Sequence, residues 1–119
     1  MTNVEFLNDN FGTNYKRYDR CRWSYSDDLK VWMIAFDGRV RYGWKNEVSG
    51  TKIIELFVEP LENQISTHRD FDETYRLVVD KEQNYKILGV YKYDEINSDK
   101  RTCRIWEKVA ISLEEFLQK

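Results

Sequence analysis

The stretch KVWMIAFDGRVRYGW, residues 30–44, carries the strongest fold signal in the chain. Residues 30–36 and 39–44 are rich in the β-branched and aromatic side chains that favour strands, and Asp37-Gly38 lies between them. An Asp-Gly pair between two such runs is typical of a two-residue type I′ turn, because that turn needs positive φ at both central positions. The sequence therefore predicts a β-hairpin that turns at Asp37-Gly38.

A two-residue loop would also fix which side chains share a face of this hairpin. One face would be wholly apolar and is expected to join the core, and it carries Val31, Met33, Ala35, Val40, Tyr42 and Trp44. The opposite face would mix apolar with basic side chains, and it carries Trp32, Ile34, Phe36, Arg39 and Arg41.

Alternating apolar and polar residues predict further strands on both sides of this hairpin. These strands are expected at residues 18–25, 52–59, 75–79, 85–93 and 102–110. A helical turn capped by Thr2 or Asn3 is expected over residues 4–8, and a polar loop or short helix over residues 61–72.

The C-terminal end has the pattern of a helix start. Ser112 with Glu115 forms a capping box, and Ile111 with Phe116 forms a hydrophobic staple, so a short helix is predicted to begin at Leu113. Such a short helix is unstable alone and must pack on the sheet. Together the elements predict a mainly antiparallel α+β fold with a barrel-like or strongly curved sheet and a short C-terminal helix.

Length and composition set the remaining bounds. The 119 residues fit a single domain, 1–119, and the aromatic share of 15% argues against disorder. Cys21 and Cys103 lack a disulfide or zinc spacing, which suits a reducing compartment. No apolar run approaches the roughly 20 residues of a membrane span, and the start has no signal-peptide pattern. A cytoplasmic location is expected.

Charge is distributed unevenly along the chain. Residues 14–45 hold eight basic and four acidic side chains, whereas residues 46–119 hold eleven basic and fifteen acidic ones. The net charge of −2 is not typical of a nucleic-acid-binding protein, which is usually basic overall. Residues 14–45, however, are locally basic and rich in aromatic residues.

This basic segment contains the candidate binding residues, which are Arg17, Arg20, Arg22, Trp32, Arg39 and Arg41. Arginines bind phosphates bidentately and flat side chains stack on unpaired or flipped bases, so the segment favours DNA or RNA as a partner. Two alternatives use the same residues. A protein with an acidic surface could bind there, or the aromatic residues could be covered by other elements while the arginines lie at the edge of the core.

Catalytic and metal-binding patterns are weak in this sequence. His68, the only histidine, stands in Thr67-His68-Arg69-Asp70 and could serve an RNase-like enzyme as an acid–base group. No partner carboxylate is indicated for it, and one histidine with two separated cysteines does not make a zinc site. We therefore expect no cofactor and no metal, and favour a protein without enzymatic activity.

A segment near the C-terminal end, about a fifth of the chain, resembles a known family. The segment LGVYKYD, residues 88–94, followed after a short loop by RIWEK, residues 104–108, is similar to the closing hairpin of small β-rich, SRA-like recognition domains of bacterial restriction and HNH nuclease systems. The resemblance spans residues 88–109. It implies a curved β-domain of bacterial or phage origin that reads DNA, including modified bases, without cleaving it.

Three functions follow from these observations. The first is a non-enzymatic module that recognises nucleic acid, the second is a protein-binding module such as a phage-type inhibitor or a defence-system adaptor, and the third is a small RNase-like enzyme that uses His68.

Overall fold

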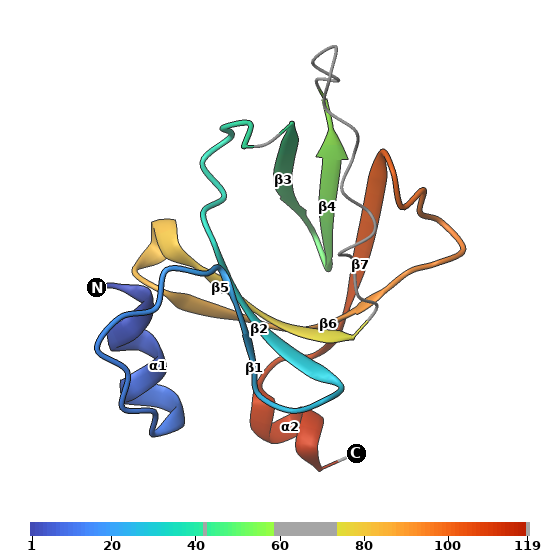
Figure 1. Ribbon diagram of the computed structural model, residues 1–119. Coiled ribbons are helices and arrows are strands. Elements are labelled where there is room, and N and C mark those ends of the chain that lie inside the picture. The colour runs from blue at the N-terminus through green and yellow to red at the C-terminus, as the bar shows by residue number, and fades with distance from the viewer. Residues whose placement is uncertain (42, 59–73, 119) are drawn as a thin grey trace.

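The structure, a computed structural model, describes residues 1–41, 43–58 and 74–118 (Figure 1). Within these residues the elements are, in chain order, α1 (Asn3–Phe11), β1 (Arg22–Ser24), β2 (Leu29–Ile34), β3 (Trp44–Ser49), β4 (Lys52–Phe57), β5 (Tyr75–Asp80), the 3-10 helix η2 (Lys81–Gln83), β6 (Lys86–Tyr93), β7 (Cys103–Ala110) and α2 (Leu113–Leu117).

The strands form one sheet in the order β1-β2-β5-β6-β7-β4-β3. Strands β2 and β5 pair in parallel, and each of the other neighbouring pairs is antiparallel. The sheet is strongly curved and stays open between its two edges, β1 and β3 (Figure 1). These findings confirm the predicted class, a mainly antiparallel α+β fold with a curved sheet and a short C-terminal helix.

Each face of the sheet has its own buried core. The face that we call the outer face is covered by both helices: Phe6 and Leu7 of α1 belong to its core, and Leu113 and Phe116 of α2 pack against it (Figure 1). The opposite, inner face has a second core that is rich in aromatic side chains, and its buried members are Trp32, Ile34, Ile53, Val78, Tyr91, Tyr93 and Trp106. Burial on both faces makes β2, β5 and β6 the centre of the fold.

The predicted hairpin at Asp37-Gly38 is wrong. Strand β2 pairs with β1 and β5, and the chain after Ile34 leaves the sheet instead of turning back along β2. Residues 31–34 are buried on both faces, so β2 is a central strand that takes a parallel neighbour, β5, rather than the partner next to it in sequence. Tyr42, one of the predicted hairpin residues, lies outside the described residues.

The two-residue hairpin of this region lies later in the sequence. Strands β3 and β4 pair with Ser49 opposite Lys52, which leaves Gly50 and Thr51 as the turn. Gly50 has a φ of 59°, a conformation that glycine adopts without the steric cost that a Cβ atom brings. The predicted strand over residues 39–44 is therefore wrong, since β3 begins only at Trp44.

Both predicted helices are present. Thr2 caps α1 by accepting a hydrogen bond from the backbone N–H of Glu5, and α1 continues to Phe11. The hydroxyl of Ser112 accepts the N–H of Glu115 at 3.1 Å, which confirms the predicted start of α2 at Leu113. Within the described residues, no helix is long and apolar enough to span a membrane. Residues 61–72, with the catalytic candidate His68, lie outside the described residues.

Candidate functional site

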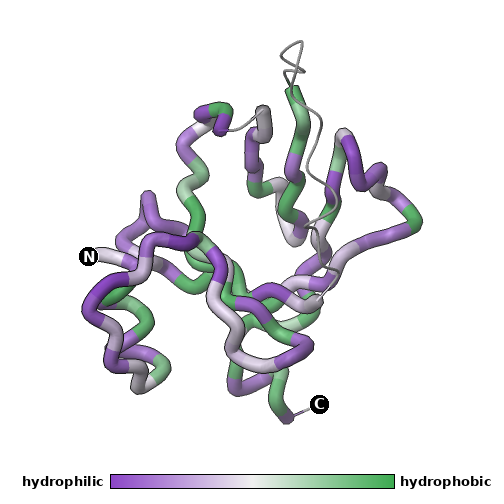
Figure 2. Tube along the Cα trace, viewed as in Figure 1, coloured by the Kyte–Doolittle hydropathy of each residue, from purple (hydrophilic) through white to green (hydrophobic). Residues whose placement is uncertain are grey.

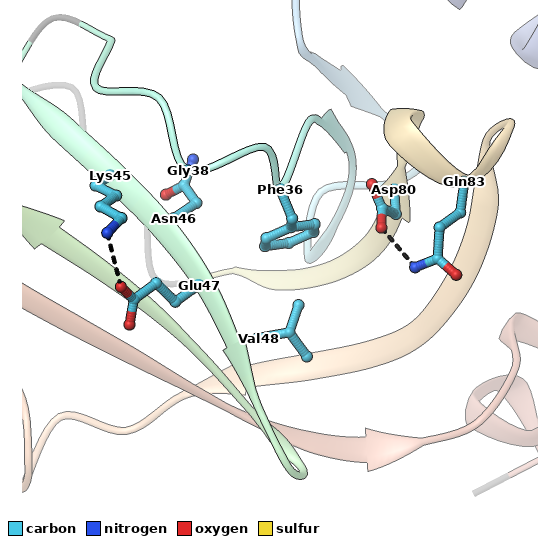
Figure 3. Close-up of a pocket in the computed structure, with 8 residues that line it drawn as sticks. All are labelled: Phe36, Gly38, Lys45, Asn46, Glu47, Val48, Asp80 and Gln83. Carbon is cyan, nitrogen blue, oxygen red and sulfur yellow. Dashed lines mark hydrogen bonds and ion pairs between the residues drawn. The ribbon is translucent and has the colours of Figure 1, made fainter.

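A hollow of about 490 Å³ opens on the inner side of the curved sheet. It lies between the edge strand β3 and the region where β2 and β5 end, two parts of the sheet that are far apart in strand order. Figure 3 shows residues from these two sides facing each other. Its lining consists of Phe36, Gly38, Lys45, Asn46, Glu47, Val48, Asp80 and Gln83.

One wall of the hollow is built around Asp80, the last residue of β5. The Asp80 side chain is buried, and one of its oxygens accepts the N–H of Glu82 at 2.9 Å while the other accepts the Gln83 amide at 2.6 Å. These bonds cap η2 and hold the wall in shape. Each carboxylate oxygen can accept a second hydrogen bond, so Asp80 can still accept one from a bound molecule.

The opposite wall is the polar edge strand β3. Lys45 and Glu47 form an ion pair at 3.2 Å on this strand (Figure 3). Asn46 lies between these two in sequence, and its Oδ1 atom is buried and has no hydrogen-bond partner within the described part of the chain. A buried acceptor gains stability from a hydrogen bond, and Asn46 lines the hollow, where a ligand could bring an N–H or O–H group.

The rim of the hollow is a loop that Asp37 organises. The two carboxylate oxygens of Asp37 accept hydrogen bonds from the Arg41 guanidinium at 3.0 and 2.6 Å, and one of them also accepts the backbone N–H of Arg39. The hydrogen bond from Arg41, followed by that from Arg39, holds the pKa of the Asp37 carboxyl well below its usual range. The Asp37-Gly38 pair thus forms a bend, with Gly38 at a φ of 76°, in which Asp37 binds Arg39 and Arg41.

The two rim arginines differ from the predicted Trp32 in exposure. The side chain of Arg39 is 78% exposed and that of Arg41 48% exposed, whereas Trp32 is only 3% exposed. Trp32 packs in the inner core, where the Arg76 guanidinium lies 4.6 Å from its ring centroid. The structure therefore presents Arg39 and Arg41 to solvent and leaves Trp32 beneath the surface.

The three earlier arginines lie on or before the edge strand β1. Arg17 is exposed and pairs with Asp19 at 2.6 Å, and Arg20 is exposed on the hydrophilic segment between α1 and β1 (Figure 2). Arg22 is half-buried and pairs in register with Trp32, which places its side chain toward the inner face. The backbone N–H of Met33 bonds the carbonyl of Cys21, so this segment reaches the end of β2 that leads into Phe36.

Sequence reasoning missed the residues that line the two walls. Local patterns place Asp80 in a connecting turn and Asn46 between two predicted strands. Neither residue carries a local motif, because the hollow brings together segments that are remote in sequence. The polar run of Lys45, Asn46 and Glu47 shortly before the Ser49-Gly50 turn signal is the available clue.

Metal coordination finds no support at this site. No group of three or more histidine, cysteine, aspartate or glutamate side chains that could hold a metal ion occurs among residues 1–41, 43–58 and 74–118. The hollow instead offers hydrogen-bond acceptors, one aromatic ring and a basic rim.

Comparisons with known proteins agree with this architecture. A solved structure, the 5-hydroxymethylcytosine-specific restriction enzyme AbaSI, is similar with a TM-score of 0.57 and 22% sequence identity over 85% of this chain and 35% of that chain. At this identity the likeness concerns the fold, and this chain spans about a third of that enzyme's length. No match was found among curated proteins.

A family model, the SET and RING associated (SRA) domain, matches residues 1–114. This match covers nearly all of the chain and extends the resemblance that the closing hairpin alone suggests. The chain therefore belongs to the SRA domain family, which supports a DNA-recognition module as its function.

Proposed function

We propose that this domain binds duplex DNA and holds one extruded, modified base in the hollow between β3 and the end of β5. The observation that carries the proposal is the buried Oδ1 of Asn46, which has no partner among the described residues, in a hollow with a basic rim on a fold of the SRA family. Proteins that read a base outside the helix use a concave pocket, stacking on flat side chains and hydrogen bonds to the base edge.

The chemistry of the walls favours a base with an exocyclic amino group. Asn46 Oδ1 and the Asp80 carboxylate are both acceptors, and the amino groups of cytosine and adenine are donors. The Phe36 ring, which Figure 3 shows inside the hollow, offers an aromatic surface against which a base can stack.

The rim supplies contacts to the DNA backbone. Arg39 and Arg41 stand beside the hollow with exposed guanidinium groups. Arg17 and Arg20 are exposed on the segment before β1 and would serve as further phosphate contacts, for which Arg17 would leave its partner Asp19. Arginine pairs bidentately with phosphate, and such contacts position the duplex without reading its sequence. Arg41 would exchange its Asp37 partner for phosphate, or share it.

A modified cytosine is the base that we propose for the hollow. The similar restriction enzyme is specific for 5-hydroxymethylcytosine by its own description. Bacterial or phage origin and a non-enzymatic, reading role belong to the same proposal.

Binding of labelled duplexes tests this function. Each duplex carries one central cytosine, 5-methylcytosine or 5-hydroxymethylcytosine, and affinity is measured over a series of salt concentrations. We expect Asn46→Leu to lower the preference for the modified duplex while the salt dependence stays unchanged. Arg39→Ala and Arg41→Ala should weaken binding to all duplexes and lower the salt slope by about 0.9 each.

Lys92→Ala is the matched control, because Lys92 is an exposed cation that lies between Tyr91 and Tyr93 of the inner core and so points to the outer face. It should change neither the base preference nor the salt slope. Absence of any duplex binding by the wild-type domain at low salt would refute the proposed function.

A further inference from the structure

Four side chains on the inner face form a buried polar cluster, which we call the inner-face brace: Trp32 of β2, Glu55 of β4, Arg76 of β5 and Trp106 of β7. The Arg76 guanidinium lies 4.6 Å from the Trp32 ring centroid and 4.1 Å from that of Trp106, so two indole rings flank it. Arg76 Nη1 lies 3.6 Å from Glu55 Oε1, and the same oxygen accepts the Trp106 indole N–H at 2.8 Å.

The brace joins strands that are not neighbours in the sheet. In the order β1-β2-β5-β6-β7-β4-β3, β5 and β4 are separated by β6 and β7. Three inter-strand spacings in a flat sheet amount to about 14 Å, whereas the Arg76 and Glu55 side chains approach to 3.6 Å. The contact therefore runs across the concavity and ties one half of the curved sheet to the other.

The brace is also connected to both walls of the hollow. On the β2 side, Phe36 packs against the inner core that contains Trp32 and Trp106. On the β4 side, Glu55 pairs in register with Arg104, whose guanidinium lies 4.2 Å from the ring centroid of Trp44, the first residue of β3. Strand β3 then continues directly into Lys45 and Asn46 of the facing wall.

We propose that the inner-face brace sets the width of the hollow and thereby the size of the base that fits it. Arg76 and Glu55 act as positioning residues: neither lines the hollow, and both determine how far its walls stand apart. A planar guanidinium held between two rings has one favoured orientation, which a lysine ammonium cannot reproduce. The claim about base size rests on the proposed function, but the claim about width does not.

The width is tested by the distance between two spin labels, one at Ser49 on β3 and one at Glu82 on η2. Both positions are exposed and outside the lining of the hollow. The labels are attached to introduced cysteines after Cys21→Ser and Cys103→Ser have removed the native thiols. We expect a narrow distance distribution in the otherwise unchanged domain and a clearly broader one in Arg76→Lys.

Leu77→Ala provides the control, because Leu77 is buried in the outer core next to Arg76 in sequence. It should lower thermal stability without broadening the distribution. If Arg76→Lys does not fold, Glu55→Gln takes its place, since a glutamine oxygen can still accept the Trp106 N–H while the charge that faces Arg76 is gone. A folded brace variant with the wild-type distribution would overturn the proposal.

Base selection is measured on the same variants with the duplexes described above. Arg76→Lys should reduce the preference for the modified over the unmodified duplex by about ten-fold, the scale of discrimination that pocket shape provides, with an unchanged salt slope. A broadened distribution with undiminished preference would overturn the role in base selection. A wild-type domain that binds no duplex refutes the proposed function, and the spin-label distances then decide by themselves whether the brace sets the width.

Discussion

Of Gly12, Gly38, Gly50 and Gly89, Gly89 in β6 should tolerate substitution least. Its φ is 140°, and a Cβ atom at this position would lie 2.6 Å from the carbonyl oxygen of Ala110 and 3.2 Å from Cε of Lys108. The lysine chain can move, but the Ala110 oxygen belongs to the backbone of β7. Near Gly89, β6 has a register irregularity with each of its two neighbours, β5 and β7, which fits a close approach of two strands.

The expected cost of Gly89→Ala combines two effects. Forcing a non-glycine residue into this backbone conformation costs about 2 kcal/mol, and relieving the overlap with a fixed oxygen costs about 2 kcal/mol more. The free energy of unfolding should therefore fall by about 4 kcal/mol, and Tm by roughly 16 °C at about 4 °C per kcal/mol for a chain of this length.

Gly12→Ala separates the two effects. Gly12 caps α1 with a φ of 67°, and a Cβ atom added there would meet no atom within 4 Å, so only the backbone cost of about 1 kcal/mol applies. Both variants are compared with the wild type by urea unfolding followed by far-UV circular dichroism. If Gly89→Ala loses no more stability than Gly12→Ala, the tight β6–β7 packing at this point is incorrect.

Three further predictions concern single contacts. The Asp37 carboxyl should titrate below its ordinary pKa, because Arg41 donates hydrogen bonds to its charged form. The contribution of this pair to stability is therefore present above the pKa of the unfolded chain and is lost only as pH falls through the lower pKa of the folded state. Carbon NMR should show the Asp37 titration midpoint rising toward the ordinary value in Arg41→Ala, and an unchanged midpoint would contradict the pairing. Ser112→Ala removes the acceptor at the start of α2 and should cost about 1 kcal/mol in urea unfolding, while no change would mean that the cap is not formed in solution. Trp106→Phe keeps an aromatic ring but leaves the buried Glu55 oxygen without the indole donor, and a loss of about 1–3 kcal/mol is expected; a neutral result would show that Glu55 finds another donor.

The local elements of the fold could be predicted where the sequence carries a local rule. The Ser112 cap, the strands near residues 75–79 and 102–110, and the curved antiparallel class follow from capping and alternation. The prediction of a hairpin at Asp37-Gly38 was wrong, because a turn motif indicates which backbone conformation the two residues can adopt but not which strands pair. Burial of β2 on both faces, which depends on β5 far along the chain, decides its partner.

The candidate site was predictable only in part. Local charge indicates Arg39 and Arg41, and the structure places both, exposed, at the rim of the hollow. The residues of the two walls could not be predicted, because Asn46 and Asp80 lie on opposite sides of the hollow and share no sequence motif. Trp32 is a candidate only for its aromatic ring, which the structure uses beneath the surface to flank Arg76.

Entry of a base into the hollow requires that the base leave the helical stack, and fluorescence can report this extrusion. A duplex with 2-aminopurine next to a single 5-hydroxymethylcytosine reports unstacking as a rise in fluorescence. The informative variant is Val48→Trp, because Val48 lines the hollow and is 47% exposed, so a larger side chain fills the space without removing a charge. We predict that the wild-type domain raises the fluorescence at saturation and that Val48→Trp binds the duplex without doing so. An equal rise with both proteins, or none with the bound wild type, would show that the hollow does not receive the base.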